Sequence, residues 1–343
     1  MTMTASATAM QHFHDVDHAL GDKKCRYFGE GHRAVRRVVE ATGPAGSPEL
    51  RARLAYPERW SVKRHASLVP HVSTIDALAI AGRIAGDYLR RECDHSEEMV
   101  RRAWIRSFEV RAGSTPVESL DDIPVQVQRM EASPSRHCPT DIVLAFDIGN
   151  MRATIAVVPS PSPPQSELTD APSSGHRERP TANDRRAERD FWLHHSEHRE
   201  HSIRSVTVDG GGYSADALAR VIATEPHDPF SGLGAAYSGS VSMIDTLVIF
   251  AQLAQVLAYQ VDGMSRDESS TFWMRRVHLT TVSPEQPHGM WNGVEVSVLR
   301  SRLLTLGGAN WRSLALTGRT MGYSCDGDVA HALPDRGEND DDY

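Results

Sequence analysis

The chain contains an internal repeat. Residues 72–85 (VSTIDALAIAGRIA) and 241–254 (VSMIDTLVIFAQLA) are identical at seven of fourteen positions, where chance would give about one. The same offset of 169 residues pairs further positions up to residue 127, namely Trp104 with Trp273, Arg106 with Arg275, Val125 with Val294 and Val127 with Val296. A register held without gaps over such a distance indicates a duplication, so the chain must fold as two copies of one unit.

Each copy has the same order of predicted elements. An amphipathic strand begins at His32 or His201, and a turn-rich stretch leads to one long apolar helix, over residues 72–90 or 241–260. Residues that alternate with a period of two then predict strands, over 104–110, 123–130 and 141–158 in the first copy and over 272–279, 293–299 and 311–320 in the second. One buried helix followed by antiparallel strands is typical of the hot-dog architecture. We therefore predict an α+β fold, a double hot-dog of two tandem units, each an antiparallel sheet wrapped around a central helix.

The composition divides the chain into five segments. Residues 159–195 are rich in proline, serine and charge, and such a segment cannot bury enough apolar surface to become ordered. We predict a flexible N-terminus over 1–24, the first repeat over 25–158, a disordered linker over 159–195, the second repeat over 196–334 and an acidic tail over 335–343.

The bulk properties exclude several classes of protein. A net charge of −8 argues against non-specific nucleic-acid binding, which requires a basic surface. The four cysteines have no CxxC spacing, which excludes a zinc ribbon and fits reduced thiols in a cytosolic protein. The apolar stretch over residues 247–258 is interrupted by Gln252 and Gln255 and is too short to span a bilayer. We expect a cytoplasmic protein with no membrane or nucleic-acid partner. The sequence does not decide whether it forms a homodimer.

The start of each long helix carries the most informative residues. Ser73 and Asp76 are spaced as in a capping box, and Ser242 and Asp245 repeat the pattern. Both aspartates are therefore candidate helix caps. In hot-dog dehydratases and thioesterases, however, an acid early in the central helix works with a histidine of the opposite unit, and the run from Pro70 to Leu78 resembles that helix entry.

The two copies differ in their histidines. His65 and His71 occur only in the first copy, and their equivalents are Gly234 and Ser240. A site with its histidine in one half and its aspartate in the other would show this asymmetry. The candidate catalytic residues are Asp245, His71, His65 and Asp76, although each histidine could equally be a surface imidazole. The chemistry requires no metal and no redox cofactor.

Further residues are candidates for substrate binding. We predict core positions for Trp104 and Trp273, while Arg106 and Arg275 face the other way and could bind an anionic group. In the Gly29–Gly31 segment, the glycines indicate a tight turn or a loop that approaches a ligand, with Glu30 or His32 projecting into it. Tyr237, before the second helix, is a further candidate.

Several of these segments together resemble the AvrD avirulence-protein family: residues 27–31 (YFGEG), Tyr56-Pro57 with Trp60-Ser61, residues 70–78, and residues 273–276 (WMRR). The resemblance runs from about residue 25 to about residue 325, without the linker. It implies a biosynthetic enzyme, because AvrD-type proteins direct the formation of syringolides, which are acylated lactones made from a β-ketoacyl chain and a pentulose. The resemblance supplies no catalytic residues.

The leading hypothesis is therefore an acyl-transfer and condensation enzyme. It would join a β-ketoacyl thioester, carried by CoA or an acyl-carrier protein, to a small keto-sugar and form a lactone-type signal molecule. A single site would lie where the two helix starts face each other. One alternative is a hot-dog dehydratase or thioesterase that acts on acyl thioesters. Another is a non-catalytic protein that binds an acyl chain or a lactone.

Overall fold

The computed structural model describes residues 9–42, 49–63, 66–130, 141–160, 189–224, 230–269 and 272–334. These residues form one 13-stranded antiparallel sheet and two short strand pairs. The large sheet contains β1 (Gln11–Asp15), β2 (Arg36–Thr42), β3 (Glu49–Ala55), β6 (Trp104–Arg111), β7 (Ile123–Met130), β8 (Ile142–Ile148), β9 (Met151–Val158), β11 (Arg199–Val208), β12 (Ser214–Ala223), β14 (Phe272–Thr281), β15 (Asn292–Leu306), β16 (Ala309–Thr320) and β17 (Tyr323–Ala332). The short pairs are β4 (Val62–Lys63) with β5 (Ala66–Ser67) and β10 (Arg189–Asp190) with β13 (Phe230–Ser231).

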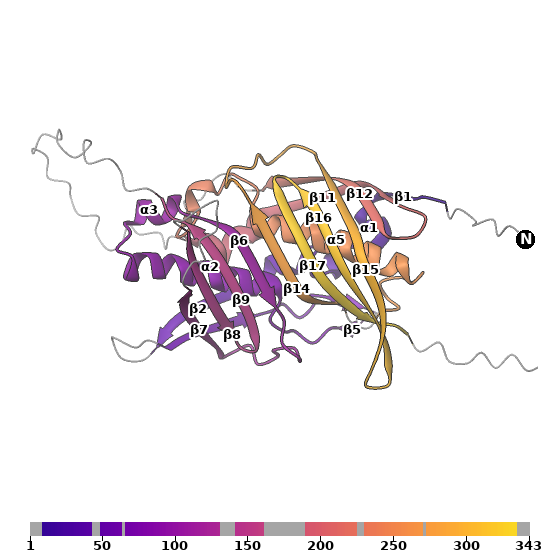
Figure 1. Cartoon of the computed structure of the whole chain (residues 1–343), viewed down its shortest axis with the longest axis horizontal. Helices are drawn as coiled ribbons and strands as arrows, with labels where there is room; N and C mark the ends of the chain where they lie inside the picture. The colour runs from indigo at the N-terminus through magenta and orange to yellow at the C-terminus, as the bar shows by residue number, and fades with distance from the viewer. Residues whose placement is uncertain are drawn as a thin grey trace, which may run out of the picture.

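Helices occupy one side of this sheet. The two long ones are α2 (Thr74–Glu92) and α5 (Met243–Val261), and Figure 1 shows both behind the strands. The shorter helical segments are α1 (Val16–Leu20), η1 (Lys23–Cys25), η2 (Gly31–Ala34), α3 (Glu97–Arg102), α4 (Phe191–His194), η4 (His195–His198) and η5 (Ala235–Tyr237).

The strands of the two repeats follow the same order. From the outer edge to the centre, the first repeat runs β2-β3-β7-β8-β9-β6, and the second runs β11-β12-β15-β16-β17-β14. The two series meet at the centre, where β6 and β14 pair antiparallel and place Val110 opposite Val277 and Phe108 opposite Leu279. Because all four of these side chains are buried, the junction is part of the core and the two repeats share one sheet.

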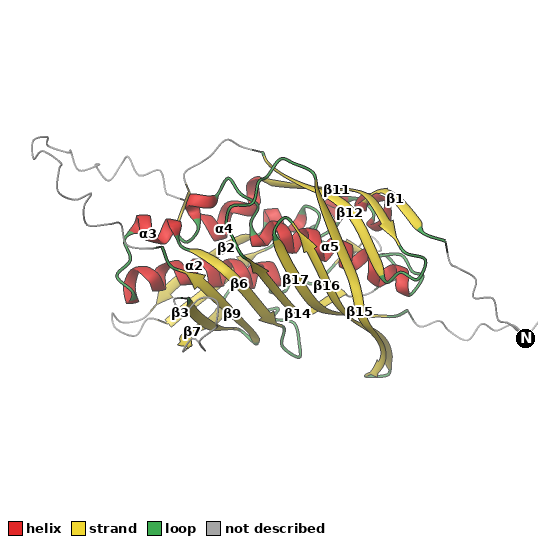
Figure 2. Ribbon diagram, turned by 45° about the horizontal axis from the view of Figure 1, so that its top comes forward, coloured by secondary structure: helices red, strands yellow, loops and turns green. Residues whose placement is uncertain are grey.

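The two long helices form as the sequence predicts. Ser73 and Ser242 cap α2 and α5, and in both helices Asp76 or Asp245 completes the capping box. α5 is apolar on all sides and its residues from Met243 to Tyr259 are buried, which is the pattern of a helix enclosed by other elements. By length and composition α5 could cross a membrane, but 89% of its apolar window is buried inside the protein, as in the core helix of a soluble fold. Figure 2 shows α2 and α5 lying along the same face of the twisted sheet.

The structure extends the folded part beyond the predicted segments. Residues 11–20, assigned to the flexible N-terminus, form β1 and α1, and β1 adds to the outer edge of the second repeat by pairing with β11. Arg189 to His195, assigned to the linker, form β10 and α4 and continue into η4, and Trp192 and His195 are buried. Both segments are short and are rich in histidine and charged residues, so their apolar residues, such as Phe191 to Leu193, were insufficient to predict order. The rest of the linker, over 161–188, and the acidic tail lie outside the described residues.

Other element boundaries also differ. The strand expected from His32 begins at Arg36, because Gly31–Ala34 form a 3-10 turn. β17 was not predicted, since its inward-facing set includes Cys325, Gly327 and His331 and gives only a weak apolar alternation. A tight turn at Gly149 and Asn150 connects β8 to β9, with Gly149 at a φ of 57°.

Candidate functional site

The largest part of the candidate site is a cavity at the start of α2, called here the α2 cavity. Its empty volume is about 890 Å³ including the open mouth. The first repeat contributes the helix entry from His71 to Thr74, and the second repeat contributes Gln255 of α5 and Phe272 to Met274 of β14. The cavity therefore lies between the two repeats, and each repeat contributes different side chains.

The chemistry of its wall is mixed. Aromatic rings from Tyr27, Phe28, Trp60, Phe272 and Trp273 form much of the lining, together with aliphatic side chains such as Val72 and Val117. The cationic side chains Arg26, Lys63 and Arg266 also line it, and no aspartate or glutamate is among its described lining residues. Such a cavity suits a ligand with an apolar part and a polar or anionic part.

A smaller cavity occupies the equivalent place at the start of α5. This α5 cavity has an empty volume of about 380 Å³. Its lining includes Val241, Ser242 and Met243, which match Val72, Ser73 and Thr74, and Trp104 of β6, which matches Trp273. Trp192 of α4 also lines it, and none of its described lining residues is charged at neutral pH. The two helix starts thus line separate cavities. The expectation that the two helix starts face each other is wrong. The start of α2 faces β14 and the start of α5 faces β6, which is in each case the central strand of the other repeat.

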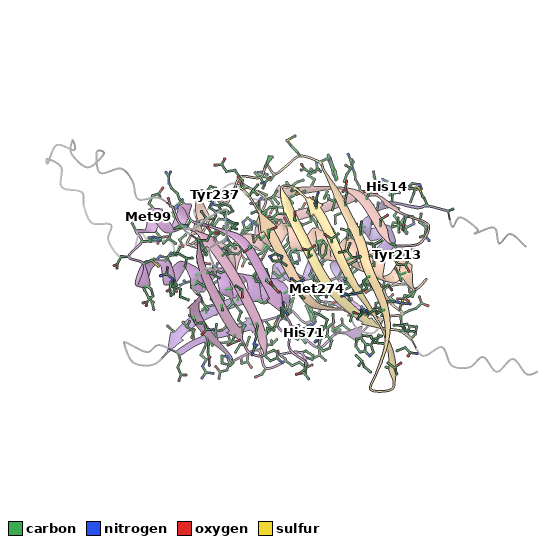
Figure 3. The ribbon with its side chains drawn as sticks, viewed as in Figure 1. His14, His71, Met99, Tyr213, Tyr237 and Met274 are labelled. Atoms are coloured by element: carbon green, nitrogen blue, oxygen red, sulfur yellow. The ribbon has the colours of Figure 1, made fainter. Side chains whose placement is uncertain are left out.

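His71 is the predicted catalytic residue that reaches a cavity. It lines the α2 cavity, and its ring meets that of Trp60 edge-on with centroids 5.7 Å apart. Its Nδ1 lies 3.1 Å from the carbonyl oxygen of Val69. A carbonyl only accepts, so Nδ1 is the donor, and in the neutral ring Nε2 then has the lone pair that can take a proton. Figure 3 shows His71 near Met274, which lines the same cavity. His65 lies outside the described residues.

Asp76 is enclosed by hydrogen-bond donors. Its side chain is fully buried, and it accepts hydrogen bonds from the backbone and hydroxyl of Ser73 at 2.9 and 2.6 Å. Nε of Arg37 donates to it at 2.7 Å, and the hydroxyl of Tyr56 donates as well. Tyr27 extends the network through the Ser73 hydroxyl. Every oxygen of Asp76 is therefore engaged, and its carboxylate is absent from the lining of the α2 cavity.

Asp245 has two histidine partners that were not among the candidate residues. Nε2 of His201 lies 2.8 Å from one carboxylate oxygen, and Nε2 of His195 lies 3.4 Å from the other. Ser242 donates from its backbone and its hydroxyl, both at 2.8 Å. Burial alone would raise the pKa of Asp245, but the hydrogen bonds from His195 and His201 and the charge of Arg199 hold this pKa well below its usual range.

His71 and Asp245 are therefore not brought together. Asp245 is fully buried and lines neither cavity, while His71 contacts Trp60 and Val69. The sequence did contain one signal for the actual partners, since His201 matches His32 at the repeat offset. His195 could not be found in this way, because it falls in the segment that the composition assigned to the linker.

His32 connects the two aspartate networks. It is fully buried, its Nδ1 donates to the carbonyl of Tyr27 at 3.0 Å, and its carbonyl accepts from Arg37 at 3.1 Å. Its ring lies 5.7 Å from that of His201. Burial, followed by the charge of His201, holds the pKa of His32 well below its usual range, so the ring is neutral at pH 7. His32 lines neither cavity.

Gly29 and Gly31 are needed for close packing and not for a positive φ. A Cβ on Gly29 would lie 2.2 Å from the Lys23 carbonyl oxygen, and one on Gly31 would lie 2.0 Å from that of Trp60. Glu30 pairs with Lys23 at 3.1 Å and does not line a cavity. The Gly29–Gly31 segment therefore packs against the backbone at Lys23 and Trp60 and does not approach either cavity.

The two predicted arginines stack on their tryptophans. The guanidinium of Arg106 lies 5.5 Å from the Trp104 ring, and that of Arg275 lies 4.9 Å from the Trp273 ring. The expectation that they face the other way is wrong, because residues i and i+2 share a face of a strand. Arg106 pairs with Asp141 and Arg275 donates to the Gly113 carbonyl, and neither arginine lines a cavity. Both tryptophans are half-buried at cavity walls and not in the core.

Tyr237 lines the α5 cavity, where its hydroxyl donates to the carbonyl of Arg102 at 3.1 Å. In Figure 3 it lies at the opposite edge of the molecule from His71. Among the described residues, no group of three or more histidine, cysteine, aspartate or glutamate side chains is placed to hold a metal ion.

The family of the chain follows from its match to a known sequence profile. The profile described as Pseudomonas avirulence D protein (AvrD) matches residues 11–334, which is nearly the whole chain. The protein belongs to the AvrD family. The match begins at the start of β1 and ends just after β17, so the family domain includes the N-terminal segment that completes the sheet. No curated protein matches the chain by sequence.

The solved structures that match the chain are distant from it. A conserved protein of unknown function with a hot dog fold from Alicyclobacillus acidocaldarius matches with a TM-score of 0.37 at 10% identity, over 89% of this chain and 96% of that one. A variant of the PpsC dehydratase domain from Mycobacterium tuberculosis has a TM-score of 0.36 at 11% identity, over 88% and 98%. An acyl-CoA thioesterase II from Mycobacterium marinum has a TM-score of 0.34 at 11% identity, over 75% and 91%. At this distance the site must be interpreted from its own residues.

Proposed function

We propose that this AvrD-family protein is a biosynthetic enzyme that acts on an acyl thioester in the α2 cavity, with His71 as general base. The observation that carries the proposal is the placement of His71 at the cavity wall with its Nδ1 beside the Val69 carbonyl, because Nε2 is then the atom of the neutral ring that accepts a proton. The corresponding position in the second repeat is Ser240, which cannot serve as a base, so one active site per chain is expected.

The cavity supports thioester chemistry in two further ways. Its aromatic and aliphatic walls suit an acyl chain, and the start of α2 supplies positive helix-dipole character beside them. The backbone N–H of Thr74, the first residue of α2, has no acceptor among the described residues. It can therefore donate to the oxyanion that forms when a thioester carbonyl is attacked. Asp76 acts as a positioning residue, since it holds the helix start through Ser73 and Arg37.

The family resemblance adds the finer reaction. His71 removes a proton from a hydroxyl of a keto-sugar, the oxygen attacks the carbonyl of a β-ketoacyl thioester, and the carbon–sulfur bond breaks as the thiolate leaves and takes up a proton. The base then removes a proton from the carbon between the two carbonyls of the new ester. That carbon attacks the ketone of the sugar, and the new carbon–carbon bond closes the lactone ring as the resulting alkoxide is protonated. In this proposal the two repeats are two hot-dog units side by side.

The test is product formation by the purified protein. β-ketoacyl thioesters of several chain lengths are incubated with a panel of keto-sugars, and the products are identified by mass. The expected product contains both reactants less the carrier thiol, and His71→Gln should remove most of it. His14→Gln is the matched control, because His14 lies on the exposed strand β1. A wild-type rate in His71→Gln would refute the assigned base.

The same assay separates the alternatives. Release of free acid without the sugar would identify a thioesterase, and loss of water from a β-hydroxyacyl thioester would identify a dehydratase. Ligand binding without any turnover would identify a non-catalytic binding protein. The full engagement of both aspartates as helix caps is the observation that favours this last alternative.

A further inference from the structure

The α2 cavity has a cluster of cationic and amide side chains that the thioester chemistry leaves unused. Arg26, Arg266 and Lys63 all line it, and their exposed fractions are 1%, 7% and 7%. Gln255, which projects from α5, is 8% exposed and lines the same cavity. These four residues are called here the basic end of the cavity.

Contacts within the basic end show that its members are neighbours. Arg266 donates to the carbonyl of Cys25, the residue before Arg26, at 3.0 Å, and to the carbonyl of Val62, the residue before Lys63, at 2.8 Å. Arg26 donates to Gln252 at 2.8 Å, one helical turn from Gln255. The three cations are therefore gathered at one part of the wall.

Two polar groups there lack a partner among the described residues. The amide of Gln255 makes no hydrogen bond to any described residue, although its side chain is more than nine-tenths buried. Nε of Arg26 also has no acceptor among the described residues, but it is closed off from the cavity, so the amide of Gln255 is the group that a ligand can reach. Buried donors are nearly always satisfied in native proteins, so an unfilled donor at a cavity wall indicates an acceptor on a ligand or on water.

The charge balance points to the same kind of ligand. Asp17 pairs with Arg26, but this aspartate is 42% exposed, and the Asp267 carboxylate lies 3.7 Å from Arg266 and is 69% exposed. Neither aspartate lines the cavity. Burial lowers the pKa of Arg26, the charge of Asp17 raises it, and the charge of Arg266 lowers it again, because the two guanidinium groups repel each other. An anion between them would relieve this repulsion.

The second repeat provides an internal comparison. At the offset of 169 residues, Arg26, Lys63, Gln255 and Arg266 correspond to His195, Gly232, Gly86 and Glu97. None of these four lines the α5 cavity, and none of the described residues that do line it is charged. The shared fold therefore does not require a basic end, and only the cavity that also holds His71 has one.

We propose that the basic end binds a phosphate group of a phosphorylated reactant, through Arg26, Arg266, Lys63 and the amide of Gln255. Guanidinium groups bind phosphate oxygens by paired hydrogen bonds, and an amide N–H can donate to a further oxygen. The inference rests on the proposed function for the place of the reaction. The phosphate could be that of a keto-sugar phosphate or that of a phosphopantetheine carrier arm, which share this chemistry.

The test measures binding and not turnover, so that it is independent of the proposed reaction. Calorimetric titration of the full chain compares xylulose 5-phosphate with xylulose, and 4′-phosphopantetheine with pantetheine. At least one phosphorylated compound should bind about tenfold or more tightly than its unphosphorylated counterpart, and the pair that shows this preference identifies the source of the phosphate. Higher salt should weaken the preference.

Two variants test the assigned residues. Gln255→Glu keeps the size of the side chain, breaks no described hydrogen bond and places a negative charge beside the cations, so it should fold and lose the preference for phosphate. Arg266→Gln should also lose it. Arg152→Gln is the control, because Arg152 is highly exposed and lies outside the α2 cavity.

Equal affinity within both pairs of compounds, absence of binding by both phosphorylated probes, or an unchanged preference in folded Gln255→Glu would overturn the inference. Lactone formation from unphosphorylated reactants with no such preference would leave the proposed function standing and remove only the phosphate site. A phosphate preference without turnover would support the phosphate site and count against the proposed reaction.

Discussion

Asp76 and Asp245 occupy equivalent positions, yet their replacement by asparagine should have different energetic consequences. Both carboxylates are fully buried, and both complete a capping box. They differ in their cationic partners, since Asp76 pairs with Arg37 whereas Asp245 pairs with His201 and His195. An arginine cannot lose its proton in a protein, whereas a histidine can become neutral.

The magnitudes follow from this difference. In Asp76→Asn the guanidinium of Arg37, which is 4% exposed, stays charged and loses its counter-ion, and breaking such a buried pair costs about 3–5 kcal/mol. In Asp245→Asn a neutral imidazole can still donate to or accept from the amide, so the loss is that of charge-assisted hydrogen bonds, about 1.5–3 kcal/mol. Asp76→Asn should therefore be the more destabilising, by about 2 kcal/mol between the centres of the two ranges.

The assay is urea unfolding at pH 7, followed by tryptophan fluorescence, with the free energy of unfolding extrapolated to water. The pH matters for Asp245, whose pKa is depressed in the folded state. Its contribution is fully present above the unfolded pKa near 3.9 and is lost as the pH falls through the folded value. Asp216→Asn is the control, because Asp216 is exposed on β12, and it should change stability by less than about 0.5 kcal/mol. Equal losses for the two buried aspartates, or a larger loss for Asp245→Asn, would refute the reasoning.

Three further predictions follow from other parts of the molecule. His71→Gln should lower turnover by about 10² to 10⁴-fold, the usual contribution of a general base, with little change in unfolding free energy; a large loss of stability would instead indicate a structural role. Stability should fall as the pH is lowered from 7 to 5, because burial depresses the folded pKa of His32 and His195 and the unfolded chain therefore binds more protons below about pH 6.5. A free energy of unfolding that does not change across this range, measured by urea titration at several pH values, would contradict this. Gly82→Ala should destabilise by about 1–3 kcal/mol, since its Cβ would lie 2.4 Å from the buried Trp192 ring, whereas Gly293→Ala, with open space around it, should have little effect in thermal melts.

Local patterns were sufficient for the central elements. The sequence predicts α2 and α5 to within about two residues, because their apolar periodicity and capping residues act within one helix. The strands from Trp104 and Ile123 were found for the same reason. β1 and α4 were missed, because each short segment is ordered by contact with a distant part of the chain: β1 by pairing with β11, and Trp192 by packing on Gly82.

The candidate site was predicted in part. The asymmetry between His71 and Ser240 indicated which helix start carries a histidine, and the structure places His71 at the larger cavity. The partners of the aspartates could not be predicted from spacing. Arg37 and His201 lie 39 and 44 residues from Asp76 and Asp245, and they are placed beside them by strands β2 and β11 of the sheet. Arg26, Gln255 and Arg266 likewise meet only in three dimensions.

The sequence by itself determined that the chain is a duplication with two capped apolar helices and period-two strands, since identity, periodicity and capping are properties of neighbouring residues. Only the tertiary structure decided that the repeats share one sheet through β6 and β14 and that the two helix starts line separate cavities. It also decided that the cavity beside His71 is the one with buried cations. The physical reason is that strand pairing and the burial of charge depend on contacts between residues far apart in the chain. The sequence alone does not show which of these residues come into contact.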